Sequence, residues 1–241
     1  MKEVRFFYVP QARQATELPE DESRHALRVL RLQGGDDIYL MDGEGTFYRA
    51  MVTLAAGKHC GYRIEETLPQ EKTWNGRIHL AIAPTKMIDR IEWMLEKATE
   101  IGFDEATMLH CRFSERKHVR IDRLDKIVIS AMKQSRKAWK PVVNDLTKFK
   151  EFVERPCEGR KFICHCYNEI EQADLYTELQ SMSGDEPVTV LVGPEGDFST
   201  DEVRLAMANG YESVTLGHSR LRTETAGLMA VTMAHLSKRK S

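Results

Sequence analysis

Two segments of the sequence combine residue types that suit a ligand site. The first, 191–199, reads Leu-Val-Gly-Pro-Glu-Gly-Asp-Phe-Ser, an apolar run that enters two glycines around a proline and a carboxylate. Gly193 and Gly196 permit a close approach of the backbone to a ligand. The second, 216–227, reads Leu-Gly-His-Ser-Arg-Leu-Arg-Thr-Glu-Thr-Ala-Gly. Together they predict a ligand-binding pocket, although each alone also fits an ordinary strand-to-helix turn.

Common phosphate-binding and nucleophile motifs are missing from both segments. The sequence has no G-x-G-x-x-G dinucleotide fingerprint, no P-loop pattern and no G-x-S-x-G nucleophile elbow. The run Cys164-His165-Cys166 lacks a second ligand pair at zinc spacing, and its alternation suits a buried strand. We therefore expect no metal.

From residue 76 onward the sequence alternates strands and helices, which predicts an α/β domain with a largely parallel sheet. The expected strands are 78–83, 106–109, 161–166, 188–192 and 213–216, and the expected helices are 88–101, 121–138, 199–209 and 223–236. Ligands bind beyond the carboxyl ends of the strands in such sheets, and both segments follow strands. Ser199 with Glu202 matches a capping box, and Thr223 is the expected N-cap of the last helix.

The first seventy residues predict a small, mostly β domain. The expected strands are 4–9, 36–41, 47–54 and 60–68, with one short helix at 21–32. Asp42-Gly43 between two apolar runs is a strong hairpin signal. Several short strands with one helix suggest a small barrel. A polar linker at 69–75 divides the chain into expected domains 1–70 and 76–241.

The composition is that of a globular protein without a membrane segment. The 241 residues are 41% hydrophobic and 30% charged, with a formal net charge of −2. No apolar run reaches the length of a membrane span, and residues 1–10 lack the apolar stretch of a signal peptide. Five cysteines without a regular framework favour reduced thiols in a cytoplasmic protein. With so little net charge, binding of nucleic acid must use local basic clusters.

Five blocks of the sequence, in order, resemble those of the ribosomal RNA small subunit methyltransferase E family, the uridine-N3 branch of the SPOUT methyltransferases. The blocks are His25-x-x-x-Val29-Leu30-Arg31 with Gly34; Lys86, Glu92, Lys97, Glu100 and Gly102; Ala131-x-x-Gln134-Ser135 with Pro141; Gly193-Pro194-Glu195-Gly196-x-Phe198-Ser199; and Leu216-Gly217-x-x-x-Leu221-Arg222-Thr223-Glu224-Thr225-Ala226. The resemblance extends over the whole chain. Three positions depart from the family pattern, which has glutamate at Lys133, arginine at Lys137 and glycine at Asp197.

The resemblance implies a C-terminal SPOUT domain with a trefoil knot, preceded by a PUA-like β-barrel that binds RNA. In the relatives S-adenosyl-L-methionine lies bent in the knot. The positions that match its binding loops are His165, Val192, Gly193, Pro194, Glu195, Gly196, Leu216, Gly217, Leu221, Arg222 and Thr223. The resemblance also implies a homodimer with the knotted region at the interface.

The reaction implied by the resemblance is methylation of N3 of a uridine in 16S ribosomal RNA of the small ribosomal subunit. Uridine N3 carries a proton at neutral pH, so the proton must leave and the developing negative charge must be stabilised. Arg222 is the expected stabiliser of an O2 or O4 oxyanion, and Glu224 or Glu195 the expected proton acceptor. Glu224 also suits the dipole at a helix start, so its role stays open.

Basic clusters in two regions suit contacts with RNA phosphates. The expected RNA-binding residues are Arg24, Arg28, Arg31, Arg112, Arg116, Arg136 and Lys137. A solvated surface explains each charge singly, whereas their clustering favours RNA. Two alternatives remain: a SPOUT methyltransferase that acts on another RNA site, and a non-catalytic RNA-binding protein with a degenerate pocket.

Overall fold

The computed structural model describes residues 5–240, which form two compact units. One unit consists of the residues up to Lys72 together with Ile129–Lys140, and the other of Thr73–Val128 together with the residues from Pro141 onward. Helix α3 (Ile121–Ser135) therefore gives its first residues to the second unit and its last residues to the first. The linear domain prediction placed all of 129–140 in the second domain.

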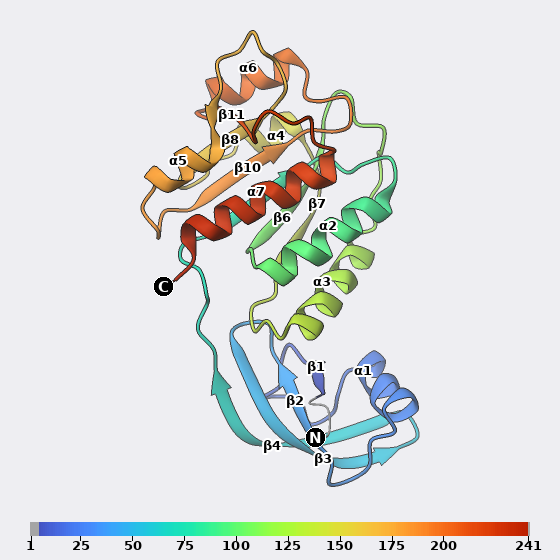
Figure 1. The fold of residues 1–241 in the computed structure, drawn as a ribbon. Coiled ribbons are helices and arrows are strands. Elements are labelled where there is room, and N and C mark those ends of the chain that lie inside the picture. The colour runs from blue at the N-terminus through green and yellow to red at the C-terminus, as the bar shows by residue number, and fades with distance from the viewer. Residues whose placement is uncertain (1–4, 241) are drawn as a thin grey trace. The chain divides into compact units, whose positions relative to one another are not determined.

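The first unit is built on a four-stranded sheet in the order β1-β2-β3-β4 (Figure 1). The strands are β1 (Phe6–Tyr8), β2 (Asp37–Met41), β3 (Thr46–Ala56) and β4 (His59–Pro69), with β1 parallel to β2 and the other pairs antiparallel. The predicted hairpin is confirmed, since β2 and β3 pair around the Asp42-Gly43 turn. The predicted first strand begins at Val4, which lies outside the described residues. The predicted helix consists of α1 (Glu20–Arg24) and a π-helical turn, η1 (His25–Val29).

The segment 129–140 completes this first unit through specific contacts. A Cβ on Gly45 would lie 2.3 Å from Trp139 Cζ2, so only glycine admits that indole ring. Lys133 Nζ lies 2.7 Å from Glu22 Oε1, and both side chains are largely buried. Glu22 thus supplies the opposite charge that Lys133 needs in this partly buried position.

The second unit contains a seven-stranded sheet in the order β7-β6-β5-β10-β8-β11-β9, in which every pair is parallel. The strands are β5 (Ile78–Ile82), β6 (Glu105–His110), β7 (Val142–Lys148), β8 (Arg160–Cys164), β9 (Ala173–Asp174), β10 (Val188–Val192) and β11 (Glu212–Thr215). Every residue of β5 and β10 is buried, as expected for central strands covered on both faces. The prediction of an α/β domain with a largely parallel sheet is confirmed.

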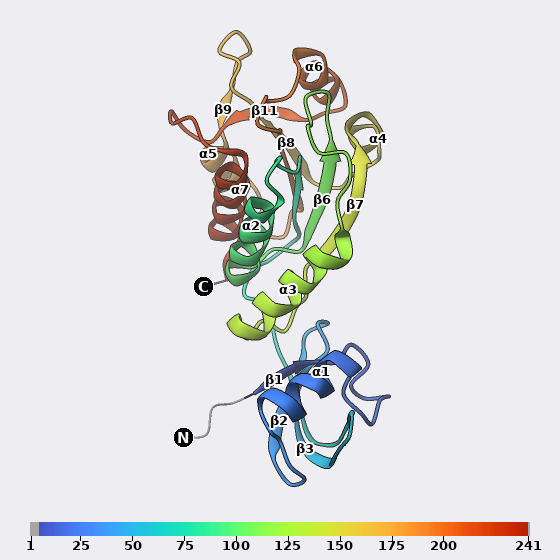
Figure 2. The same ribbon diagram turned by 90° about the vertical axis from the view of Figure 1, so that its right-hand side faces the viewer.

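Helices cover both faces of this sheet, and the three layers are visible in Figure 2. One face carries α2 (Ile88–Ile101), α5 (Leu175–Ser181) and α7 (Thr223–Lys238); the other carries α4 (Phe149–Val153) and α6 (Thr200–Ala208). Gly227 brings α7 close to β5, because a Cβ there would lie 2.7 Å from Ile82 Cδ1. Helix α2 packs beside α7 on the same face.

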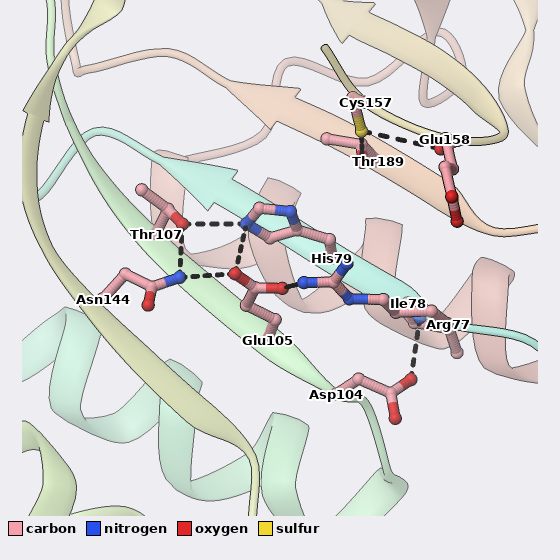
Figure 3. A network of polar contacts seen from close by, with 10 residues as sticks. All are labelled: Arg77, Ile78, His79, Asp104, Glu105, Thr107, Asn144, Cys157, Glu158 and Thr189. Carbon is pink, nitrogen blue, oxygen red and sulfur yellow. Dashed lines mark hydrogen bonds and ion pairs between the residues drawn. The ribbon is translucent and has the colours of Figure 1, made fainter. Parts of the chain in front are cut away.

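A buried polar network lies among the first residues of β5, β6 and β7, as Figure 3 shows. His79 Nε2 is 2.8 Å from Thr107 Oγ1 and 3.8 Å from Glu105 Oε1. Asn144 Nδ2 donates hydrogen bonds to both of these oxygens, and Arg77 pairs with Glu105. Burial, with a smaller effect of the Arg77 charge, lowers the pKa of His79 from 6.5 to about 4. The imidazole is therefore held neutral.

Four elements of the second unit were not predicted: β7, α4, β9 and α5. β7 is an edge strand whose residues are exposed or half-buried, so it lacks the apolar run that marks β5 and β10. α4 and β9 are too short for periodicity to show. Among residues 5–240, no helix combines the length and the apolar character needed to cross a membrane.

Candidate active site

A cavity of about 510 Å³ lies at the carboxyl ends of β8, β10 and β11. Its walls come from residues within 164–166, 192–197 and 215–223, together with Arg90 of α2 and Ala226 of α7. This is the edge at which open parallel sheets bind ligands. The volume is in the range of cofactor and small-molecule sites.

Almost every residue expected to bind the cofactor lines this cavity: His165, Val192, Gly193, Pro194, Glu195, Leu216, Gly217, Leu221, Arg222 and Thr223. Gly196 lies outside the lining and is directed elsewhere, since a Cβ there would lie 3.2 Å from Phe113 Cβ. Of the expected catalytic residues, Arg222 and Glu195 line the cavity, whereas Glu224 does not.

His165 is fixed in one neutral form by its neighbours. Its Nδ1 accepts hydrogen bonds from the Tyr167 backbone N–H at 3.2 Å and from Gln172 Nε2 at 2.8 Å, so Nε2 carries the ring proton. Nε2 donates to Ser213 Oγ at 2.9 Å, and that hydroxyl donates to Glu171 O at 2.7 Å. Burial lowers the pKa of His165, which favours the same neutral ring. His165 thus forms a rigid wall of the cavity.

Asp197 holds two walls of the cavity together. Its φ is 66°, a left-handed conformation that costs a non-glycine residue about 1 kcal/mol. Its Oδ2 accepts the Cys166 backbone N–H at 2.8 Å, and its Oδ1 accepts the Phe198 N–H at 2.7 Å. The family's glycine avoids the strain at this position, whereas the aspartate offsets it with two charge-assisted hydrogen bonds.

Glu195 joins the turn after β10 to the loop after β5. Its Oε1 accepts the Lys86 backbone N–H at 2.9 Å, and its Oε2 makes no hydrogen bond within residues 5–240. The same loop is held by Arg116, which donates to the backbone oxygens of Thr85 and Lys86. Lys86 Nζ pairs with Glu115 at 2.9 Å. One carboxylate oxygen of Glu195 is therefore committed to the loop, and the other is available.

The wall of the cavity formed by residues 215–223 includes Gly217 and the start of α7. Gly217 has a φ of 112°, and no atom lies within 4 Å of the position that a Cβ would take. Its N–H donates to Thr215 Oγ1 at 3.2 Å, and its C=O accepts from the same hydroxyl at 3.0 Å. The loop is thereby held in place, and the missing side chain leaves room in the cavity that Gly217 lines. Arg222 holds the cap position of α7 and Thr223 is the first helical residue, so the prediction of Thr223 as the N-cap is wrong. The predicted capping box of Ser199 and Glu202 is confirmed.

Arg90 belongs to the cavity although the sequence analysis did not identify it. It lies in the first turn of α2, and its Nε is 3.7 Å from Oε1 of Glu224 in the first turn of α7. The two residues are far apart in the chain, so no local spacing indicated their contact. The other lining residues were not named singly as cofactor contacts, although most lie within or next to the segments predicted to form the pocket: Cys164, Cys166, Asp197, Thr215, Ser219, Arg220 and Ala226.

The charges around the cavity are mixed. Arg90, Arg220 and Arg222 supply positive charge, and Glu195 and Asp197 supply negative charge. Such a lining suits a ligand that itself carries both signs. In the part of the chain that the structure describes, no group of three or more histidine, cysteine, aspartate or glutamate side chains is arranged to hold a metal ion.

Most residues expected to bind RNA belong to the first unit: Arg24, Arg28, Arg31, Arg136 and Lys137. The guanidinium of Arg136 lies 5.6 Å from the ring centroid of Phe6. In the second unit, Arg112 pairs with Asp201 at 3.3 Å, and Arg116 is bound to backbone oxygens. Arg116 therefore organises a loop beside the cavity.

Comparison with known proteins agrees with this architecture. Residues 72–235 match the model of the RNA methyltransferase domain, and residues 18–60 match the model of the RNA methyltransferase PUA domain. The crystal structure of a probable rRNA-methyltransferase from Porphyromonas gingivalis is 40% identical, covers 98% of both chains and superposes with a TM-score of 0.90.

Two further relatives carry a more specific name. The ribosomal RNA small subunit methyltransferase E of Neisseria gonorrhoeae, solved with bound S-adenosyl methionine, is 29% identical, covers 95% of both chains and has a TM-score of 0.79. The enzyme of that name from Synechocystis sp. is 30% identical over 85% of this chain and 67% of its own length. The chain belongs to the ribosomal RNA small subunit methyltransferase E family of RNA methyltransferases.

Proposed function

We propose that this protein transfers a methyl group from S-adenosyl-L-methionine to N3 of a uridine in 16S ribosomal RNA. The observation that carries the proposal is the cavity at the carboxyl ends of β8, β10 and β11, in a chain of this family. Its walls combine glycines, apolar side chains and both signs of charge.

The residues present fit the cofactor. Gly193 and Gly217 line the cavity without side chains, which allows adenine and ribose to approach the main chain closely. The apolar side chains of Val192, Leu216 and Leu221 line the same space. The mixed charges suit an amino-acid end that carries an ammonium and a carboxylate. When bound, the cofactor supplies an electrophilic methyl group on its sulfonium.

The reaction requires this chain to accept the N3 proton and to stabilise negative charge. We assign the proton to Oε2 of Glu195, because Glu195 lines the cavity and this oxygen makes no hydrogen bond among residues 5–240. We assign the charge on a uracil oxygen to Arg222, which lines the cavity at the start of α7. Glu224 does not line the cavity and is not placed to take the proton.

Several further properties belong to the same proposal. Exposed Arg24, Arg28, Arg31 and Arg136 suit contacts with RNA phosphates, together with Arg112 and Lys137. A homodimer would cover the apolar side chains exposed on the neighbouring helices α2 and α7, Trp93, Met229 and Leu236. The trefoil knot stays a prediction. The proposal includes a location in the cytoplasm, because the small ribosomal subunit is the proposed substrate.

The test is methyl transfer from labelled S-adenosyl-L-methionine to small ribosomal subunits that lack this modification, followed by nucleoside analysis. We expect 3-methyluridine with the wild type and with Arg204→Ala, which removes an exposed arginine of α6 outside the cavity. Arg222→Ala should lower the rate by about 10²-fold or more. A different methylated nucleoside would indicate another RNA site, and absence of cofactor binding would favour a non-catalytic RNA-binding protein.

A further inference from the structure

Arg90 lines the cavity from helix α2, which lies outside the two segments 191–199 and 216–227. It lies in the first turn of α2, and its side chain is 37% exposed. Its Nε is directed toward Glu224, at 3.7 Å from Oε1. No hydrogen bond of its two terminal amino groups is found among residues 5–240, so they remain for another acceptor while Nε faces the carboxylate.

Glu224 is a buried carboxylate whose hydrogen bonds are incomplete. Its side chain is 9% exposed, and its Oε2 has no hydrogen-bond partner among residues 5–240. A buried carboxylate oxygen without a donor is costly, so a donor that approached it would stabilise it. Arg90 is the cation paired with Glu224, and a small approach of its guanidinium would supply that donor. The N–H groups at the start of α7 also favour a negative charge at Glu224.

The uracil ring has two oxygens that can each accept a hydrogen bond while the ring is negatively charged. When the N3–H bond gives its proton to Glu195, the electron pair left on the ring is shared by N3 and the two flanking oxygens, O2 and O4. Arg222 serves one oxygen in the proposed function, and the second oxygen needs its own donor. Arg222 and Arg90 line the cavity from different elements, the start of α7 and the first turn of α2.

We propose that Arg90 is a second catalytic arginine, which donates hydrogen bonds to a uracil oxygen, and that Glu224 is the residue that positions it. This inference rests on the proposed function. It replaces the role of Glu224 as a proton acceptor with that of a carboxylate that orients a guanidinium. Preorganised donors of this kind act where charge develops in the transition state.

The test compares Arg90→Gln with Arg204→Gln, a matched change at an exposed arginine of α6. We measure kcat and KM for methylation of the small subunit from pH 6 to pH 9 at saturating cofactor, and the Kd of S-adenosyl-L-methionine by calorimetry. Arg90→Gln should lower kcat by about 10²-fold and move the rise of kcat to higher pH, because the uracil anion is less stabilised. Its Kd for the cofactor should stay within about twofold, a change too small to count as a lost contact. Arg90→Lys should restore part of the rate, because it returns the charge without the fork of donors.

Glu224→Gln keeps the buried volume and tests positioning separately. We expect it to lower kcat less than Arg90→Gln and to shift the pH profile in the same direction. The double variant should be no worse than Arg90→Gln alone, since both changes act through one guanidinium. A Glu224→Gln variant that is inactive beside an active Arg90→Gln would overturn the positioning role.

Two results would overturn the role of Arg90. One is an unchanged pH profile and kcat in Arg90→Gln. The other is weakened binding of S-adenosyl-L-methionine with unchanged binding of 5′-methylthioadenosine, which lacks the carboxylate, because Arg90 would then hold the cofactor. The wild type separates the two proposals: wild-type enzyme that makes no 3-methyluridine refutes the proposed function, whereas an active wild type with an unaffected Arg90→Gln refutes only this inference.

Discussion

The buried His79 makes the stability of the second unit dependent on pH. Its pKa is lowered to about 4 in the folded protein, compared with its ordinary value of 6.5, and the residue is 8% exposed. The unfolded chain therefore binds a proton more readily than the folded chain. Stability is fully present above pH 6.5, falls as the pH decreases toward 4, and changes no further below that value. Glu105 and Arg77, the charged groups nearest this ring, pair with each other (Figure 3).

The size of the effect follows from the two pKa values. Their difference of about 2.5 corresponds to about 3 kcal/mol, which is lost in full only below about pH 4, where the histidine of the folded chain is protonated too. Between pH 7 and pH 5, the part lost is about 2 kcal/mol. Replacing His79 with glutamine removes the titrating ring, so His79→Gln should lose about 2 kcal/mol less than the wild type over that interval.

Urea unfolding followed by tryptophan fluorescence measures this difference, because Trp74 is buried in the core of the second unit. The quantity compared between His79→Gln and the wild type is the change in the free energy of unfolding from pH 7 to pH 5. The free energy of unfolding at pH 7 is not compared, because the substitution also lowers it. His118→Gln removes an exposed imidazole and should keep the wild-type dependence. If His79→Gln and wild type lost equal stability between pH 7 and pH 5, the neutral buried imidazole would be refuted.

Three further substitutions test local features. Asp197→Ala keeps the left-handed strain and loses both hydrogen bonds, so it should lower the thermal midpoint and weaken cofactor binding more than Asp197→Gly, and equal effects would contradict this account. Lys133→Glu places two carboxylates together at Glu22 and should cost about 2 kcal/mol in urea unfolding, whereas Lys133→Met should cost less. Ser199→Ala removes one bond of the capping box and should cost about 1 kcal/mol, with Ser199→Asp as the tolerated control.

The parts of the fold that the sequence predicted are those with a strong local signal. Apolar runs marked β5 and β10, and the apolar face of α2 ended at Gly102 as expected. Edge strand β7 was missed because burial does not impose a pattern on it. The signature loops indicated most of the cavity, since consecutive residues line it there.

The missed contacts depend on the packing of distant segments. Arg90 meets Glu224 only because α2 and α7 pack side by side on one face of the sheet. The partner of Lys133 is Glu22, which lies more than a hundred residues earlier in the chain. The sequence around Lys133 therefore did not indicate the ion pair. Neither pair has a spacing that a helix or strand period would reveal.

The interleaving of the two units has a consequence for the order in which the chain matures. During synthesis the residues up to Lys72 emerge first, but Trp139, which fills the space beside Gly45, is made only after half of the chain. Domains usually fold in order from the N-terminus, whereas here the first unit waits for its own segment 129–140, which follows part of the second unit in the chain. A single cut near residue 72 would therefore not release a complete module, and an exchange of this module between proteins must carry residues 129–140 with it.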